Sequence, residues 1–182
     1  TASAGTEFAV GDMVVYTFHG KCQITGIETK IVGGQSISFY RVEVVRSAFA
    51  RTSRKEPAIW IPVANATERG LRRPLVTEEL AAVWAILENR EYYLSTSESW
   101  HSIQPKIEVL IRLEGGPGLA KVVSYFHVLK KRLIVLPSEI SKANENVTRL
   151  LVREISEATG EQARTIEEKM QKSMRHKLLL DN

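Results

Sequence analysis

The residue types that usually carry catalysis or bind metal ions are few and scattered in this sequence. Its four histidines are His19, His101, His127 and His176. None of them is spaced with another histidine, a cysteine or a carboxylate in the way that metal ligands are. The single cysteine, Cys22, has no indicated base partner that would make it a nucleophile. We therefore expect a binding module rather than an enzyme, with no metal site and no cofactor.

One aromatic residue has a setting that suits contact with a partner. Trp100 lies in STSESWHSIQP, residues 95–105, among serines and next to His101. Trp84, by contrast, lies four residues after Leu80 and three before Leu87, which is the spacing of a helical core. Trp100 has no such apolar partners in sequence. It is therefore either exposed for a partner or folded back onto a helical bundle.

Length and composition suit a globular protein of one domain or two small ones. The 182 residues are 43% hydrophobic, which is enough for packed cores. No stretch approaches the roughly 20 apolar residues of a membrane helix, and the start lacks the regions of a secretion signal. One cysteine permits no intramolecular disulfide, which fits a reducing compartment. We expect a cytoplasmic monomer without membrane contact.

The net charge of +4 permits contact with nucleic acid without arguing strongly for it. Residues 1–75 hold 10 Lys/Arg and 6 Asp/Glu, a net of +4, whereas residues 76–160 hold 10 and 11, a net of −1. Any DNA-binding surface in the second half must therefore be a local patch.

The first third of the chain has the composition of short strands. We expect strands at residues 13–18, 22–31, 36–45 and 58–62. Paired glycines at Gly33-Gly34 tolerate the positive φ of a tight hairpin turn. Residues 46–56 form a long basic loop. Such strands in about 60 residues predict a small, highly curved sheet or barrel.

After Gly70 the apolar residues follow helical spacing. We expect helices that begin near Thr77, Pro105, Leu119, Pro137 and residue 161, the fourth of them ending at Gly160. The fold class is therefore α+β, with a β module at residues 1–75, a helical bundle at 76–160 and an amphipathic tail at 161–182. The tail could pack on the bundle, contact a partner or stay free of both, and we favour packing and partner contact equally.

Several motifs resemble the CarD/CdnL family of bacterial transcription regulators, whose N-terminal module is shared with the transcription-repair coupling factor. Residues 8–35 carry Gly11-Asp12, a V-V-Y strand, His19-Gly20 and Ile27-Glu28 in the family's order. The segment IPVANATERGLR at 61–72 continues the match. The segments LAKVVSYF at 119–126 and LLVREISEA at 150–158 resemble family helices. The resemblance covers residues 8–160 and is strongest in the N-terminal module.

This resemblance implies a fold and a role. The N-terminal module is expected to be a Tudor-like small β-barrel that docks on the β subunit of RNA polymerase. The helical domain is expected to contact upstream promoter DNA weakly and without sequence specificity, beside the melting −10 region. Together they would stabilise the open promoter complex, and no reaction is catalysed.

The resemblance also assigns residues to the polymerase contact. The family uses the strand edge after the Ile-Glu pair and a side chain just before the Val-Pro segment. In this sequence those positions are Glu28, Thr29, Lys30, Ile31 and Trp60. An exposed edge offers unpaired N–H and C=O groups to a partner strand.

For DNA, the resemblance places Trp100 as a wedge in the minor groove at the upstream edge of the bubble, where an apolar ring opposes re-closure. The arginines that follow this tryptophan in the family are replaced here by His101, Ser102 and Ile103. Other basic residues could supply the phosphate contacts of the missing arginines. Together with Trp100 and His101 they make up the expected DNA-binding set, namely Lys106, Lys130, Lys131, Arg132 and Lys142. Lys142 matches a basic family position.

A second hypothesis remains open beside the regulator. The β module could dock on polymerase while the altered helical domain binds another protein factor instead of DNA. The missing arginines and the extra tail motivate this adaptor reading. An enzyme has no supporting constellation of residues.

Overall fold

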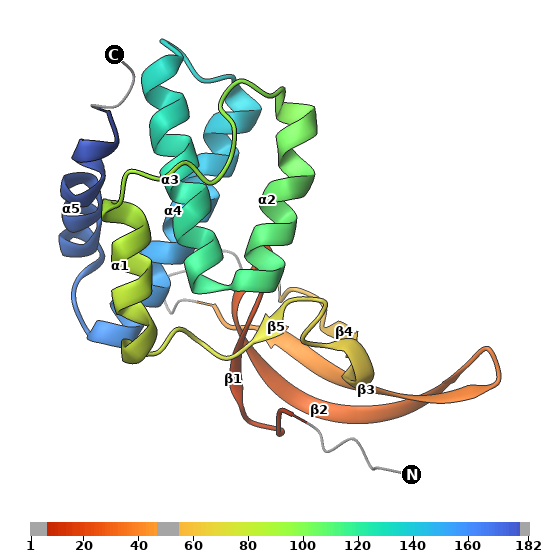
Figure 1. The fold of residues 1–182 in the computed structure, drawn as a ribbon. Coiled ribbons are helices and arrows are strands. Elements are labelled where there is room, and N and C mark those ends of the chain that lie inside the picture. Colours follow the sequence, from red (N-terminus) through yellow and green to blue (C-terminus); the bar gives the residue numbers. More distant parts are fainter. Residues whose placement is uncertain (1–6, 47–54, 179–182) are drawn as a thin grey trace. The chain divides into compact units, whose positions relative to one another are not determined.

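The computed structural model describes residues 7–46 and 55–178, so most of the expected loop at 46–56 lies outside the described residues. The chain divides after Pro74 into two compact units, which we call the β unit and the helical unit. Each unit has its own hydrophobic core. The α+β class predicted from the sequence is confirmed (Figure 1).

The β unit is one antiparallel sheet of five strands in the order β4-β3-β2-β1-β5. The strands are β1 (Met13–Tyr16), β2 (Gly20–Val32), β3 (Gln35–Val44), β4 (Ile59–Pro62) and β5 (Leu71–Arg72). Two short 3₁₀ segments, Thr17–His19 and Val63–Asn65, connect them. The first four strands agree with the expected ranges within two residues. Strand β5 was not predicted, because two residues are too few to produce an alternating pattern.

A tight turn and a bulge shape this sheet. Gly33 and Gly34 have φ of 58° and 79°, so both central positions of the β2–β3 turn are left-handed, as the paired glycines predicted. Pairing of β2 with β3 shifts between Ile24 and Gly26, which makes Thr25 a β-bulge. A bulge increases local twist and bends the strand. The sheet is therefore strongly curved and can enclose a core with only five strands.

Residues that alternate along the strands fill the core of the β unit. Cys22 lies opposite Val14 on β1 and Val44 on β3, and Tyr40 lies opposite Ile61. The Tyr40 hydroxyl accepts a hydrogen bond from the Phe8 N–H at 3.2 Å. The buried set is Phe8, Val14, Cys22, Ile24, Tyr40, Val42, Ile61, Ala66 and Leu71.

The thiol of Cys22 should be inert toward alkylating reagents in the folded protein. It is fully buried, and burial raises its pKa from 9.0 to about 11. Because the thiolate is the reactive form, iodoacetamide at about pH 8 should modify Cys22 only when the β unit opens. Mass spectrometry with and without urea measures this, and rapid native labelling would contradict the burial.

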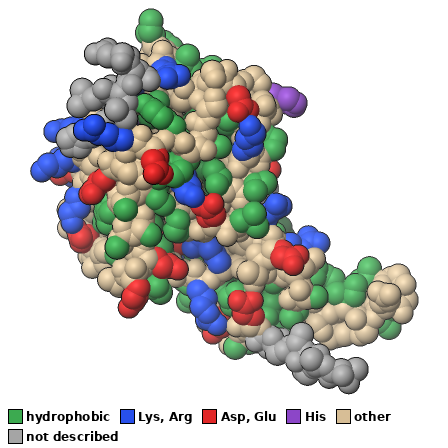
Figure 2. All heavy atoms as spheres, viewed as in Figure 1, with side chains coloured by type: hydrophobic (Ala, Val, Ile, Leu, Met, Phe, Trp, Pro, Cys, Tyr) green, Lys and Arg blue, Asp and Glu red, His purple; other side chains and the backbone are tan. Residues whose placement is uncertain are grey.

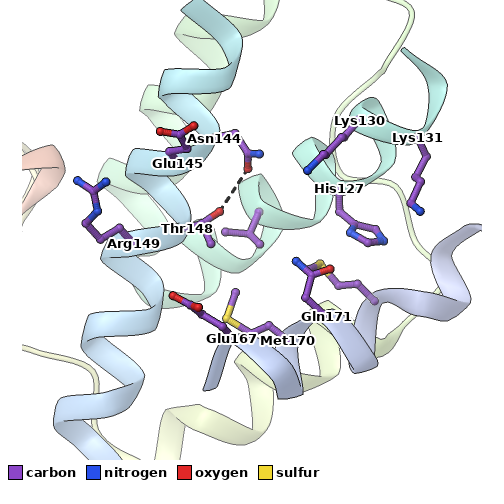
Figure 3. Close-up of a pocket in the computed structure, with 12 residues that line it drawn as sticks. His127, Lys130, Lys131, Asn144, Glu145, Thr148, Arg149, Glu167, Met170 and Gln171 are labelled. Atoms are coloured by element: carbon purple, nitrogen blue, oxygen red, sulfur yellow. Dashed lines mark hydrogen bonds between the residues drawn. The ribbon is translucent and has the colours of Figure 1, made fainter. Parts of the chain in front are cut away.

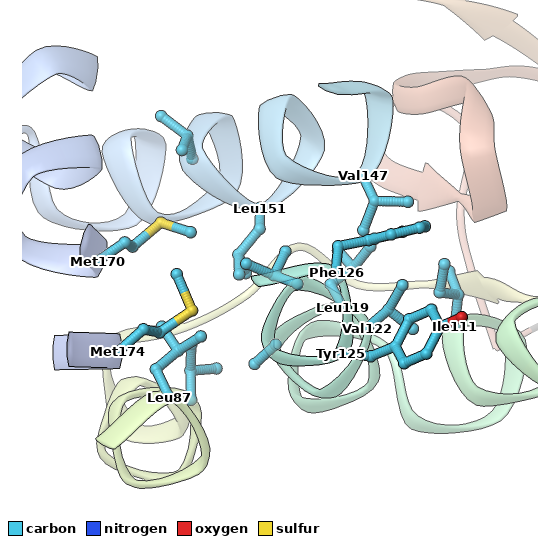
Figure 4. Packing of buried hydrophobic residues seen from close by; sticks show 14 of the residues in the cluster. Leu87, Ile111, Leu119, Val122, Tyr125, Phe126, Val147, Leu151, Met170 and Met174 are labelled. Carbon is cyan, nitrogen blue, oxygen red and sulfur yellow. The ribbon is translucent and has the colours of Figure 1, made fainter. Parts of the chain in front are cut away.

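The helical unit contains α1 (Leu80–Glu88), α2 (Trp100–Glu114), α3 (Gly116–Arg132), α4 (Ser138–Thr159) and α5 (Ala163–Ser173). Two 3₁₀ segments, Thr77–Glu79 and Met174–Leu178, flank them. Helix α3 packs against α1, α2 and α4 and is buried along most of its length. Its Leu119, Val122 and Phe126 form the centre of the core (Figure 4).

The expected starts of the first two helices are wrong. Helix α2 begins at Trp100 rather than Pro105, because the Ser99 hydroxyl caps it by accepting from the Ser102 N–H at 3.3 Å. Pro105 lies inside the helix, where it leaves only the carbonyl of exposed His101 without an intrahelical donor. Thr77 is not a cap either. It begins a 3₁₀ turn in which the Glu79 carboxylate accepts from the Val76 N–H at 3.2 Å.

The third helix also begins earlier than Leu119. Gly115, with φ of 61°, ends α2, and α3 begins at once with Gly116. The fourth helix was predicted correctly, including its left-handed cap at Gly160.

The amphipathic tail packs on the bundle. Helix α5 and the 3₁₀ segment after it bury Ile166, Met170 and Met174 in the same core as α1, α3 and α4. Packing was one of the two roles favoured from the sequence. The described part of residues 161–182 is thus integral to the helical unit.

Candidate binding surfaces

Strand β2 has an open outer edge in its second half. Among the described residues, β1 pairs with Gly20–Gln23, and the contacts of Gly11 and Asp12 extend that pairing to Ile24. Beyond Ile24 no described strand covers this side of β2, so the β2–β3 hairpin extends past the rest of the sheet (Figure 1). This open edge is the first candidate surface.

The register shows which backbone groups the open edge presents. In a hairpin closed by two residues, the closing pair, here Val32 and Gln35, is hydrogen-bonded, and bonded pairs then alternate. The backbone N–H and C=O groups of Ile27, Thr29 and Ile31 therefore point away from β3. No strand among the described residues pairs with them, so they present an edge to which a further strand can be added.

The side chains expected at the polymerase contact divide between the two faces of this hairpin. Glu28 and Lys30 lie on one face, and Thr29 and Ile31 on the other, because side chains alternate along a strand. Lys30 reaches across β3, so that its Nζ lies 3.5 Å from the ring centre of Trp60 on β4. All five expected residues are exposed, and Ile31 is 81% exposed.

Two apolar residues of this surface were missed from the sequence. Ile27 is 37% exposed and Val32 51%, beside Ile31 on the same strand. Hydrophobic side chains accordingly gather along the extended hairpin (Figure 2). Alternation along the sequence would put Ile27 and Ile31 on the face opposite core residue Ile24. The bulge at Thr25 shifts the register by one residue, so they continue the face of Ile24 past the point where the core ends, and the sequence pattern alone did not reveal this.

The second candidate surface is one end of the helical unit. The beginning of α2, the end of α3 and the beginning of α4 meet there (Figure 1). Arg132 at the end of α3 donates a hydrogen bond to Thr96, just ahead of α2. This end therefore brings together Trp100, His101, Lys130, Lys131, Arg132 and Lys142, and all of them except half-buried Trp100 are exposed.

Trp100 is folded back onto the core. Its ring lies 6.0 Å from that of Phe126, between centroids, at an interplanar angle of 42°. Its Nε1–H is buried without a hydrogen-bond partner among the described residues. An unpaired buried donor costs about 1–3 kcal/mol, which favours any rearrangement that gives the indole a partner. The wedge role stays a prediction, and it requires the ring to leave Phe126 at least in part.

Lys106 is engaged by a carboxylate. Its Nζ lies 2.9 and 2.8 Å from the two carboxylate oxygens of Glu98, which also accepts from the Ser102 hydroxyl. These hydrogen bonds, Lys106 first, lower the pKa of Glu98. Because the charge of Lys106 is already paired with that of Glu98, a phosphate would have to displace Glu98 to bind Lys106. Lys106 is thus the weakest member of the expected DNA-binding set.

Helices α3, α4 and α5 line an open pocket of about 640 Å³ (Figure 3). Its wall carries charges of both signs, namely Lys130, Lys131, Arg149, Glu145 and Glu167. His127 also lines it, and its Nε2 has no hydrogen-bond partner in the described part of the chain. Burial first, and then Lys131, Lys177 and Lys130, lower the pKa of His127, which favours the neutral imidazole.

The segment that leads to Trp100 is held by the C-terminal tail. Lys177, only 2% exposed, donates from Nζ to the Ile86 carbonyl at 2.8 Å and to the Asn89 side chain at 3.3 Å. The Tyr92 hydroxyl donates to the Lys177 carbonyl at 3.5 Å. Lys177 therefore fixes the end of α1 and the start of the loop before α2.

The free energy of unfolding of the helical unit should rise between about pH 8 and pH 10. Burial lowers the pKa of Lys177 from 10.5 to about 8, so the folded state releases this proton before the unfolded chain does. Replacement Lys177→Met should flatten the rise. Urea unfolding at a series of pH values, followed by the circular dichroism of the helices, measures the rise. The raised pKa of Tyr125 lowers the free energy of unfolding as pH increases, and it opposes the rise only towards the upper end of this range. A wild-type profile without any rise would contradict the assignment.

No group of three or more metal-ligating side chains gathers within the described ranges. None of the helices described is long and apolar enough to cross a membrane.

The comparison with known families agrees with the β unit. Residues 8–74 match the family model of the CarD-like/TRCF RID domain, which confirms the resemblance of the N-terminal module. That domain is a non-enzymatic module that interacts with RNA polymerase, at the family level through the β subunit, and it supports a role related to transcription. The helical unit lies outside the match. Among curated proteins, none matches the chain.

Proposed function

We propose that this chain, which carries a CarD-like/TRCF RID domain at residues 8–74, is a transcription regulator that stabilises the open promoter complex. The open edge of β2 and the Lys30–Trp60 pair dock on the RNA polymerase β subunit. The basic end of the helical unit, around Trp100 and Lys130–Arg132, contacts upstream promoter DNA. No reaction is catalysed, and the protein acts in the cytoplasm as a monomer.

The observation that carries this proposal is the outer edge of β2, which no described strand covers beyond Ile24, within a polymerase-interacting domain. Backbone pairing with a partner strand gives affinity, and flanking side chains give specificity. Ile31 supplies apolar contact next to the edge. Lys30 and Trp60 supply charge and an aromatic ring on one face of the sheet, with Trp60 lying across β3 from the edge. DNA contact can then be weak, because tethering to polymerase raises the local concentration of promoter DNA.

The lifetime of the open complex tests the proposal. Purified polymerase is bound to a promoter with and without the full chain and is then challenged with heparin. A longer lifetime with the protein, together with binding to the isolated β-subunit lobe, is expected. An unchanged lifetime would overturn stabilisation, and absent lobe binding would overturn docking.

One observation favours the adaptor as a second candidate. Trp100 is packed on Phe126 and Lys106 is held by Glu98, so part of the expected DNA surface is engaged within the unit. The variant Trp100→Phe keeps an aromatic contact with Phe126 and serves as control for Trp100→Ala. If both variants fold and open complexes keep their wild-type lifetime, the Trp100 ring is not the DNA wedge, and a protein factor is the better partner for that side chain.

A further inference from the structure

The connection between α3 and α4 exposes three consecutive large apolar residues. Leu133 is 39% exposed, Ile134 103% and Val135 78%. Runs of exposed apolar residues lower solubility and are avoided unless they serve a purpose. We call Leu133, Ile134 and Val135 the apolar tip.

The apolar tip is anchored at both ends. The Leu133 N–H donates to the Leu129 carbonyl at 2.9 Å, which ends α3, and Leu136 packs against the core on the other side. Pro137 follows as the cap of α4, where its carbonyl accepts from the Ser141 N–H at 2.9 Å. The tip is therefore a short prong between two fixed helix ends, with little conformational freedom to lose on binding.

The chain segment that carries the tip is rich in basic residues. Residues 128–143 contain Lys130, Lys131, Arg132 and Lys142 against Glu139 alone, a net of +3, whereas residues 76–160 as a whole have a net of −1. An apolar prong inside a basic patch matches a polyanion with an apolar interior. Duplex DNA has phosphates outside and stacked bases within, and minor-groove proteins insert isoleucine, leucine or proline wedges between base steps.

We infer that the apolar tip is a DNA-inserting element that enters the minor groove at the edge of the promoter bubble. Ile134 and Val135 contact unstacked bases, and the lysines and arginine before them hold the phosphates on either side. The inference rests on the proposed DNA contact of the helical unit and deepens it. It assigns the wedge to residues that are already exposed, whereas Trp100 must first leave Phe126.

The test compares two double variants of the full chain. Ile134→Ser/Val135→Ser removes the tip, and Val109→Ser/Leu113→Ser removes two exposed apolar residues of α2, which are 42% and 65% exposed. The tip variant should reduce the protein's effect on open-complex lifetime about tenfold with lobe binding unchanged, because the apolar contact with the bases is lost. The α2 variant should behave like wild type.

Crosslinking identifies the partner of the tip directly. The photoreactive residue p-benzoylphenylalanine in place of Ile134 should crosslink to promoter DNA at the upstream edge of the bubble. Crosslinks to a polymerase subunit or to a second copy alone would overturn the inference. A tip variant with wild-type activity would overturn it too, while leaving the proposed function intact. If the wild-type chain neither binds the β-subunit lobe nor lengthens the open-complex lifetime, both the proposed function and this inference are overturned.

Discussion

Replacing Thr29 by proline is expected to weaken binding of the chain to the RNA polymerase β subunit by about 10- to 100-fold. The Thr29 N–H points to the open side of β2, where a partner strand would accept from it. Proline removes that donor and leaves a partner carbonyl unpaired, at a cost of about 1–3 kcal/mol. The fold should tolerate the change, because proline is found where a strand's N–H faces solvent.

The matched control is Thr29→Val. It keeps the backbone N–H and the preference for strand structure, and it removes only the hydroxyl, which lies 3.0 Å from that of Ser38. Surface plasmon resonance with immobilised β-subunit lobe should find the valine variant close to wild type. If the proline variant folds and also binds like wild type, then the edge of β2 is not the docking element.

The second large effect concerns the close approach of α2 and α3. Replacement Gly118→Ala should lower the free energy of unfolding of the helical unit by about 2–3 kcal/mol. A Cβ at Gly118 would lie 2.2 Å from the carbonyl oxygen of Leu110 and 2.9 Å from its carbon. These atoms belong to the backbone of α2, so the helices themselves must separate. The gain from replacing a helical glycine, about 1 kcal/mol, does not offset this.

Gly116 provides the control for that prediction. A Cβ there would lie 2.5 Å from Leu75 Cδ1, the end of a side chain that can rotate away. Thermal unfolding should therefore find Gly116→Ala close to wild type and Gly118→Ala lower in Tm by about 10 °C or more. Equal melting temperatures for the two variants would show that α2 and α3 do not approach as closely as described.

Local patterns predicted much of the fold. The hairpin followed from Gly33-Gly34, and the fourth helix followed from its apolar spacing and Gly160. The start of α2 did not, because Pro105 is the stronger local signal, whereas Ser99 acts through one hydrogen bond to a residue three positions on. The start of a helix depends on competition between such signals, and a single residue does not show which of them prevails.

The candidate surfaces were predicted less completely, because tertiary contacts decide which residues are available. The resemblance identified Lys30 and Trp60, but their direct contact depends on β3 lying between their strands. Burial of Trp100 depends on Phe126, which is distant in sequence. Ile134 and Val135 were overlooked for the opposite reason, because apolar residues in sequence suggest a core until the structure exposes them.

The open edge of β2 has a cost for the free protein. A strand edge accepts any extended chain, and another copy of this protein offers the same edge. In an antiparallel pairing centred on Thr29, Glu28 of each copy would lie opposite Lys30 of the other, so their charges would not prevent self-association. At high concentration, molecules that are not bound to polymerase are therefore prone to aggregate through the same β2 edge that is proposed to dock on polymerase. By occupying that edge, polymerase would also act as a chaperone and keep the protein in solution.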